Sequence, residues 1–87
     1  MALYKNLSAT AQVKVGAARL VSLTVNSTSS GTIVIYDDGA KGTNNKVLNT
    51  LTPAAGTHMF WGDDGLALDN GMYVVIGSTL DVTIGYK

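Results

Sequence analysis

The segment MYVVIGSTLDVTIGY at residues 72–86 constrains the fold more than any other part of this sequence. Two runs rich in β-branched residues flank Gly-Ser-Thr at 77–79, which is the pattern of a β-hairpin. A three-residue loop there brings one apolar set of side chains onto a single face: Met72, Val74, Ile76, Leu80, Val82 and Ile84. A two-residue loop would set Val74 against Asp81, and a slip of one residue exchanges the two faces of a strand. The segment therefore predicts a core-forming hairpin with Tyr73, Val75, Asp81 and Thr83 on its other face.

Shorter runs of alternating apolar residues recur along the rest of the chain at intervals of about ten residues, as in all-β proteins. They predict further strands at 9–15, 19–26, 32–37, 46–51, 57–61 and 66–68. The segments between them are rich in glycine, aspartate and asparagine, which are turn-forming residues. This pattern predicts an all-β fold, a small antiparallel β-sandwich or jelly-roll-like barrel of about seven to eight short strands.

A chain of 87 residues is expected to form one domain. Residues 1–15 are predicted to be an N-terminal arm or edge strand, and residues 16–87 a single β-sandwich domain. Within the strand at 32–37, Ile33 and Ile35 share one face, while Val34 and Tyr36 share the other. Because both faces are largely apolar, this strand is expected to be covered on both sides or to meet a second subunit.

Composition narrows the ways in which so small a domain gains stability. There is no cysteine and only one histidine, which excludes disulfides, zinc–thiolate sites and a histidine-rich metal site within one chain. Subunit contacts remain, so we expect a homo-oligomer. Six basic residues balance six acidic ones, with no basic stripe for nucleic acid. No signal peptide and no apolar run near ~18 residues is visible, so no membrane partner is expected.

Candidate catalytic and metal-binding residues are few. His58 lacks a signature that would place a nucleophile and an orienting carboxylate beside it, so we interpret it as a surface or interface histidine. Asp37 with Asp38, and Asp63 with Asp64, offer oxygen ligands without the spacing of a calcium loop. Aspartate before glycine also suits a turn, so ion binding at these two loops stays open. We expect no catalytic residue, no metal and no cofactor.

Aromatic and apolar residues are the better candidates for contacts. In a small β protein, aromatic side chains belong either to the core or a subunit interface, or to a platform that stacks on sugars or bases. We expect the core or interface role. The residues predicted to make contacts are Leu3, Tyr4, Leu7, Tyr36, Phe60 and Trp61.

The order of strand motifs resembles that of a known family. ARLVSLTVN is followed by SGTIVIYDDG, a short strand bearing Asn and Thr, PAAGT…FWG, GMYVVIG and LDVTIGY. Over residues 16–87 this succession resembles small virion proteins of tailed bacteriophages, which are short β-sandwich or jelly-roll-like chains associated with the capsid or the tail. The resemblance carries no catalytic residue.

The resemblance implies a non-enzymatic virion structural protein, made in the bacterial cytoplasm. It implies a capsid decoration (cement) protein or a minor head or tail component, with the major capsid protein or another virion protein as partner. Self-association, as a trimer, is the expected mode of reinforcement. The alternative is a carbohydrate- or receptor-binding module on the phage tail or head surface. It would need Trp61 and a tyrosine exposed beside polar groups of the loops at 37–45 or 62–65.

Overall fold

The computed structural model describes residues 3–43, 45–62 and 64–87. Their regular structure is entirely β, which confirms the predicted fold class. The strands are β1 (Leu3–Leu7), β2 (Ala11–Val15), β3 (Ala18–Tyr36), β4 (Lys46–Leu51), β5 (His58–Phe60), β6 (Leu66–Leu68) and β7 (Gly71–Tyr86).

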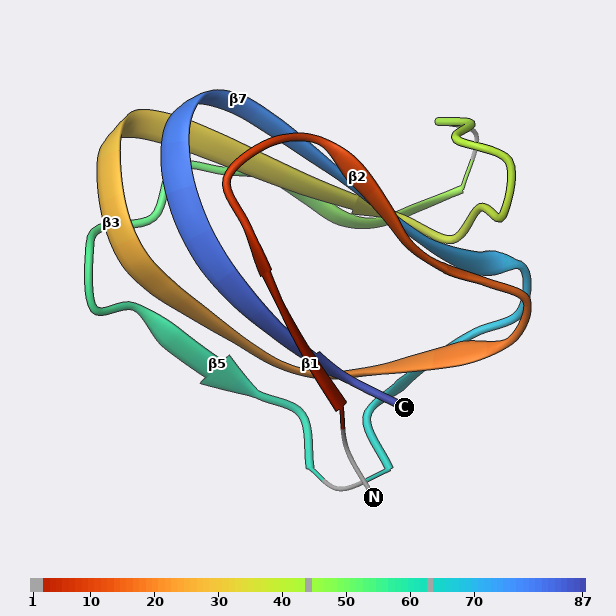
Figure 1. The fold of residues 1–87 in the computed structure, drawn as a ribbon. Helices are drawn as coiled ribbons and strands as arrows, with labels where there is room; N and C mark the ends of the chain where they lie inside the picture. Colours follow the sequence, from red (N-terminus) through yellow and green to blue (C-terminus); the bar gives the residue numbers. More distant parts are fainter. Residues whose placement is uncertain (1–2, 44, 63) are drawn as a thin grey trace.

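Two long strands, β3 and β7, organise the molecule. They pair antiparallel along most of their length, from Leu20 opposite Tyr86 to Tyr36 opposite Tyr73. Both strands bend sharply near the middle and run back, as the left side of Figure 1 shows. Register shifts occur in β3 at the bend, and Ser30 and Ser78 adopt positive φ values of 56° and 58°. Such bulges bend a strand and increase its twist, so the paired ribbon folds over itself into two layers.

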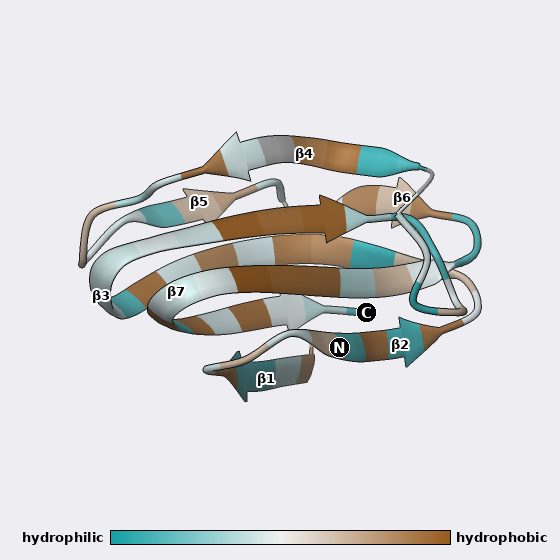
Figure 2. Cartoon of the chain, turned by 90° about the horizontal axis from the view of Figure 1, so that it is seen from above, coloured by the Kyte–Doolittle hydropathy of each residue, from teal (hydrophilic) through white to brown (hydrophobic). Residues whose placement is uncertain are grey.

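The bend divides one continuous set of hydrogen-bonded strands into two facing sheets. Sheet I contains β1, the second half of β7, the first half of β3, and β5 with β6 end to end. Sheet II contains β2, the first half of β7, the second half of β3, and β4. Figure 2 shows β3 and β7 in the middle, with β4 and β2 on opposite sides. This strand order is that of a double-sheet jelly roll.

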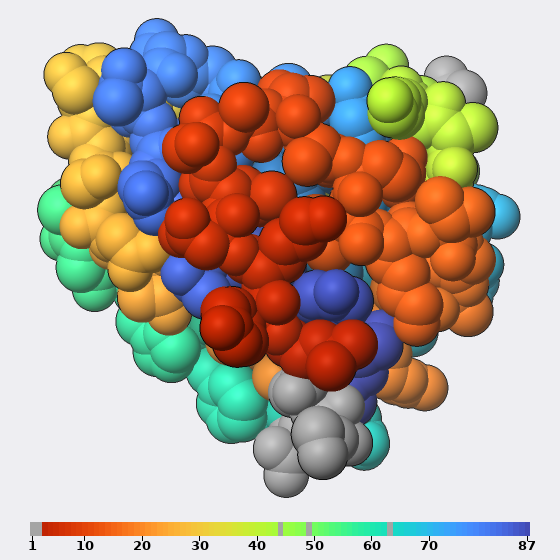
Figure 3. Space-filling model, in the orientation of Figure 1, coloured from red at the N-terminus to blue at the C-terminus, as the bar shows by residue number. Residues whose placement is uncertain are grey.

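The N-terminal strands are part of this sandwich. β1 is an edge strand beside β7 in sheet I, and β2 is an edge strand beside β7 in sheet II. Figure 3 shows both of them, in red to orange, covering one side of the molecule. Leu7 and Val13 are only 5% and 8% exposed and belong to the core cluster. Residues 3–15 therefore cover part of the core.

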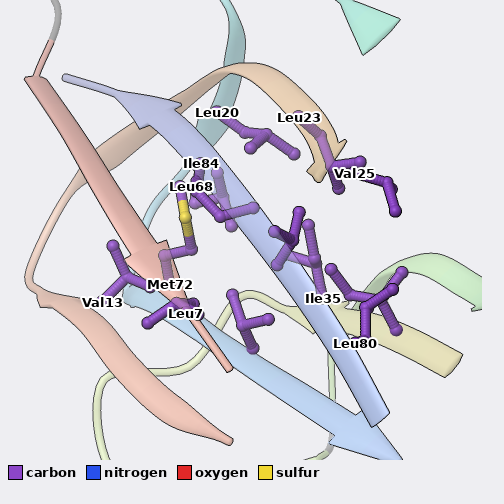
Figure 4. Packing of buried hydrophobic residues seen from close by; sticks show 13 residues of the cluster. Leu7, Val13, Leu20, Leu23, Val25, Ile35, Leu68, Met72, Leu80 and Ile84 are labelled. Carbon is purple, nitrogen blue, oxygen red and sulfur yellow. The ribbon is translucent and has the colours of Figure 1, made fainter. Parts of the chain in front are cut away.

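The core lies between the two sheets and consists of aliphatic side chains (Figure 4). From β7 it receives Met72, Val74, Leu80, Val82 and Ile84, and from β3 Leu20, Leu23, Val25, Ile33 and Ile35. Each of these side chains is at most 1% exposed. Burial of one such side chain contributes roughly 1.5–3 kcal/mol, so the facing halves of the two long strands provide most of the stabilisation.

The predicted hairpin at residues 72–86 is wrong, although its apolar face is correct. β7 continues through Gly77, Ser78 and Thr79, and Ile76 lies opposite Ile33 of β3 instead of Leu80. Residues 27–31, which lie between the strands predicted at 19–26 and 32–37 and were expected to form a turn, are likewise the bend of β3. A strand that passes from one sheet to the other keeps the same face toward the core on both sides of its bend. Its alternation of apolar residues is therefore the same as that of a hairpin with one buried face.

Candidate interaction faces

Three of the four sheet edges, formed by β1, β2 and β4, are poorly suited to pairing with another strand. Lys5 of β1 lies opposite Ile84, whose side chain is fully buried, so this lysine sits on the inner side of its edge strand. Lys14 follows a bulge in β2, and Lys46 lies in β4, where the register also shifts. Inward-facing charges, edge lysines and bulges all hinder strand addition. The outer faces of the sheets are therefore the better candidates for interaction.

The outer face of sheet II carries an apolar group at its centre. Val34 lies opposite Val75, and Tyr36 lies opposite Tyr73, all pointing away from the core. The two tyrosine rings have centroids 6.3 Å apart and planes inclined at 34°, a favourable tilted contact. Val34 is only 7% exposed although it is not part of the core cluster. We call these four residues the tyrosine–valine patch.

The outer face of sheet I differs because its centre is polar. Asp81 and Thr83 of β7 point outward, since their neighbours Leu80, Val82 and Ile84 are buried. Asn6 and Asn26 flank them from β1 and β3. Their side-chain amides donate to Asp81 Oδ1 at 2.7 Å and 3.0 Å and to Thr83 Oγ1 at 3.3 Å and 3.0 Å. We call this group of four residues the amide cluster.

The hydrogen bonds of the amide cluster act on the charge of Asp81. Donation from Asn26, and then from Asn6, lowers the pKa of Asp81 below its ordinary value of 3.8, against a small effect of desolvation. A carboxylate that accepts such bonds is stabilised in its charged form. The centre of this face therefore carries a fixed negative charge at neutral pH.

Two exposed aromatic residues stand at either side of this face. Tyr4 of β1 pairs with Gly85, Gly85 also pairs with Ser22, and Ser22 pairs with Phe60 of β5. These four residues form one row across the sheet, which we call the aromatic row. Tyr4 is 78% exposed and Phe60 is 60% exposed. A Cβ atom on Gly85 would clash with Ser22 Oγ, because the Ser22 side chain occupies the space over this glycine.

His58 lies beside the aromatic row, on the same outer face. It is exposed, and its Nδ1 is 2.7 Å from Thr24 Oγ1. Among the residues that the structure describes, no carboxylate is hydrogen-bonded to the His58 ring, so the contact with Thr24 is not part of a nucleophile–base–carboxylate arrangement. Its exposure is compatible with the prediction of a surface or interface histidine.

The acidic loop at 37–38 has a structural task. The carboxylate of Asp37 accepts backbone N–H bonds from Asp69, Asn70 and Gly71 at 3.1, 2.8 and 3.4 Å. Burial alone would raise the pKa of Asp37, but these three bonds outweigh it and lower the pKa below 3.8. Asp38 Oδ1 accepts from the Ala40 N–H at 2.7 Å, as in an Asx turn. Both side chains thus fix the loops at one end of the sandwich.

The second acidic loop is only partly described, because Asp63 lies outside the described residues. Asp64 is exposed, and its backbone carbonyl accepts a bond from Arg19 at 3.1 Å. Within the ranges that the structure describes, no group of three or more potential metal ligands comes together. The same residues enclose no pocket. Nor do they include a helix long and apolar enough to span a membrane.

The structure separates the six predicted contact residues into three groups. Leu3, Tyr4 and Phe60 are exposed, and the last two lie on the outer face of sheet I. Tyr36 is half-buried in the tyrosine–valine patch. Leu7 belongs to the core, and Trp61 is half-buried against it, away from the exposed position that a sugar platform of Trp61 would need.

Sequence reasoning missed the amide cluster. Asn6 and Asn26 stand about twenty residues apart in the sequence, and both reach Asp81 and Thr83 from opposite sides of β7. The available signal was the polar outward pair Asp81 and Thr83 in an otherwise apolar strand. Nothing in the sequence identified the asparagines as their partners, because strand order decides which residues become neighbours.

Comparison with protein-family models, with curated proteins and with solved structures finds no match for this chain.

Proposed function

We propose that this protein is a non-enzymatic virion structural protein of a tailed bacteriophage. In this role it decorates or reinforces the capsid through self-association and contacts with the major capsid protein. The resemblance of its strand motifs to small phage virion proteins suggests the role, and the jelly-roll order of its strands is compatible with it. The site of its action is then the virion, after synthesis in the bacterial cytoplasm.

The tyrosine–valine patch is the observation that carries the self-association part of this proposal. When both faces of a sheet carry apolar residues, one face packs against the core of the protein. The other face is then suited to packing against a partner. Val34, Tyr36, Tyr73 and Val75 supply a largely apolar centre, and tyrosine is enriched at protein interfaces. A second copy of the chain is such a partner, and we expect a trimer.

The protected edges support association through faces and not through strand addition. Lys5, Lys14 and Lys46 stand on the outer strands β1, β2 and β4, and the fourth edge, formed by β5 and β6, is made of two strands of three residues each. A stable interface needs about 800 Å² from each partner. The chain exposes 4549 Å², so one sheet face is enough to supply that area.

The native mass of the purified chain, measured by light scattering alone and with empty capsids, tests the proposal. We expect a discrete oligomer that saturates sites on the capsid. The double substitution Tyr36→Ser and Tyr73→Ser is expected to yield monomers, because it removes both rings of the patch. Val15→Ser is the matched control, since Val15 is 71% exposed and lies on β2, outside the patch. A wild-type monomer that ignores capsids would contradict the proposal.

A further inference from the structure

We propose that the outer face of sheet I is a carbohydrate-binding surface that takes a neutral oligosaccharide or polysaccharide chain lying across the strands. This function goes beyond the assembly role proposed above and uses the opposite face of the sandwich. It rests on the aromatic row and the amide cluster, which are adjacent on the same outward surface.

The aromatic row provides two places for sugar rings to stack. A pyranose ring has an apolar face of C–H groups, which packs on an aromatic ring, and hydroxyl groups around its rim. Tyr4 and Phe60 are separated by β7 and β3, and three strand spacings place them about 14 Å apart. That span is longer than one sugar ring, so a chain of linked sugars reaches both. Gly85 and Ser22, which lie between the two rings, have no large side chain that would stand in the way of such a chain.

The amide cluster provides hydrogen-bonding groups held in place before a ligand arrives. Asn6 and Asn26 use their N–H groups on Asp81 Oδ1 and Thr83 Oγ1. Within the described residues, these bonds leave the amide oxygens and the second carboxylate oxygen of Asp81 for other donors. Sugar hydroxyls are donors of this kind. Fixing the side chains in advance reduces the entropy lost on binding.

Charge favours a neutral sugar over an anionic one. Asp81 is the only charged side chain of the amide cluster and the aromatic row, and its hydrogen bonds keep it ionised at neutral pH. Phosphate, sulfate and carboxylate groups would be repelled from Asp81. A hydroxyl group of a neutral polyol donates a hydrogen bond to the same carboxylate.

A second copy of the chain fits this face less well. Asp residues are depleted at the centres of protein–protein interfaces, because a buried charge needs a partner. Covering this face would bury Asp81 between two amides without a cation. Covering the tyrosine–valine patch on sheet II would bury no charged residue of that patch.

The test measures the migration of the intact protein in native gels that contain dextran, mannan, soluble starch or galactan. Heparin serves as the anionic polysaccharide for comparison. We expect at least one neutral polysaccharide to retard the protein and heparin to have no effect. Phe60→Ala, Tyr4→Ala and Asn6→Ala are each expected to weaken retention about tenfold. Val15→Ala removes an equally exposed apolar side chain elsewhere and is expected to leave retention unchanged.

Several results would overturn this inference. One is the absence of retardation by all four neutral polysaccharides, and another is retention by heparin alone. Equal loss in Val15→Ala would mean that the effect does not belong to this face. Conversion of an oligomer to a monomer by Phe60→Ala would assign the face to a second copy. The Tyr36→Ser, Tyr73→Ser variant tests the two proposals separately. If polysaccharide still retards this variant, carbohydrate binding does not depend on assembly through the tyrosine–valine patch.

Discussion

The two outer faces of the sandwich come from the same pair of strands and have opposite character. On sheet II, β3 and β7 place Val34 beside Val75 and Tyr36 beside Tyr73. On sheet I, the same strands place Thr24 beside Thr83 and Ser22 beside Gly85. In sheet II the aromatic rings lie on the two central strands, β3 and β7, and pack against each other. In sheet I they stand on the outer strands β1 and β5, around a polar centre.

This difference shows how one bent ribbon provides two unlike surfaces. Both halves keep the same apolar alternation toward the core, so the bend leaves the outward positions of each half free to differ. The apolar outer face suits a protein partner, and the polar face with separated aromatic residues suits a ligand with hydroxyl groups. Substitutions at equivalent positions on the two faces should therefore have unequal effects.

The largest expected difference lies between Val34→Asp and Thr24→Asp. Val34 is nearly buried, and an aspartate there loses water without gaining a partner, which should cost about 2–4 kcal/mol in free energy of unfolding. Thr24 occupies the corresponding centre of sheet I and is half-exposed, so its substitution should cost about 1 kcal/mol or less. Urea unfolding measures both. Equal losses would remove the distinction between the two faces.

A smaller difference is expected between Tyr73→Ala and Tyr4→Ala. Tyr73 is half-buried against Tyr36, so its loss should destabilise the fold by about 1–2 kcal/mol. A double-mutant cycle with Tyr36→Ala should give a coupling of about 0.5–1.5 kcal/mol. Tyr4 is an exposed residue on an edge strand, and its removal should change stability by about 0.5 kcal/mol or less. A Tyr4 variant as unstable as the Tyr73 variant would argue against the solvent-facing role of Tyr4.

The smallest expected effect concerns pH. Hydrogen bonds to Asp37 and Asp81 lower both pKa values below 3.8, so below that pH the unfolded chain binds more protons than the folded one. Their contribution is therefore fully present above pH 3.8 and is lost as the pH falls through the folded pKa values. Asp37→Asn and Asp81→Asn should each flatten the acid side of the stability curve. Asp81 is half-exposed and accepts from two side-chain amides, whereas Asp37 accepts from three backbone N–H groups, so the Asp81 substitution should have the weaker effect. Thermal unfolding between about pH 2 and pH 6 measures both.

The sequence predicted most strands and the inward residues correctly, because a period of two marks a half-buried strand wherever it occurs. Residues 72–86 are an example, since Met72, Val74, Val82 and Ile84 are all buried as expected. The candidate contacts were less predictable. Leu3 and Leu7 look alike in the sequence, but only Leu7 reaches the core, opposite Val82. Trp61 is a large aromatic residue like Phe60, yet it packs partly against the core while Phe60 faces solvent.

What the sequence by itself determined was an all-β chain whose strands carry an apolar face for the core, because local alternation is a property of neighbouring residues. What only the tertiary structure decided was whether residues 77–79 and 27–31 end a strand or bend it. A hairpin and a bent strand bury the same side chains, so the choice depends on pairing between strands far apart in the chain. The same pairing brought Asn6 and Asn26 to Asp81, and placed Tyr4 and Phe60 on one surface.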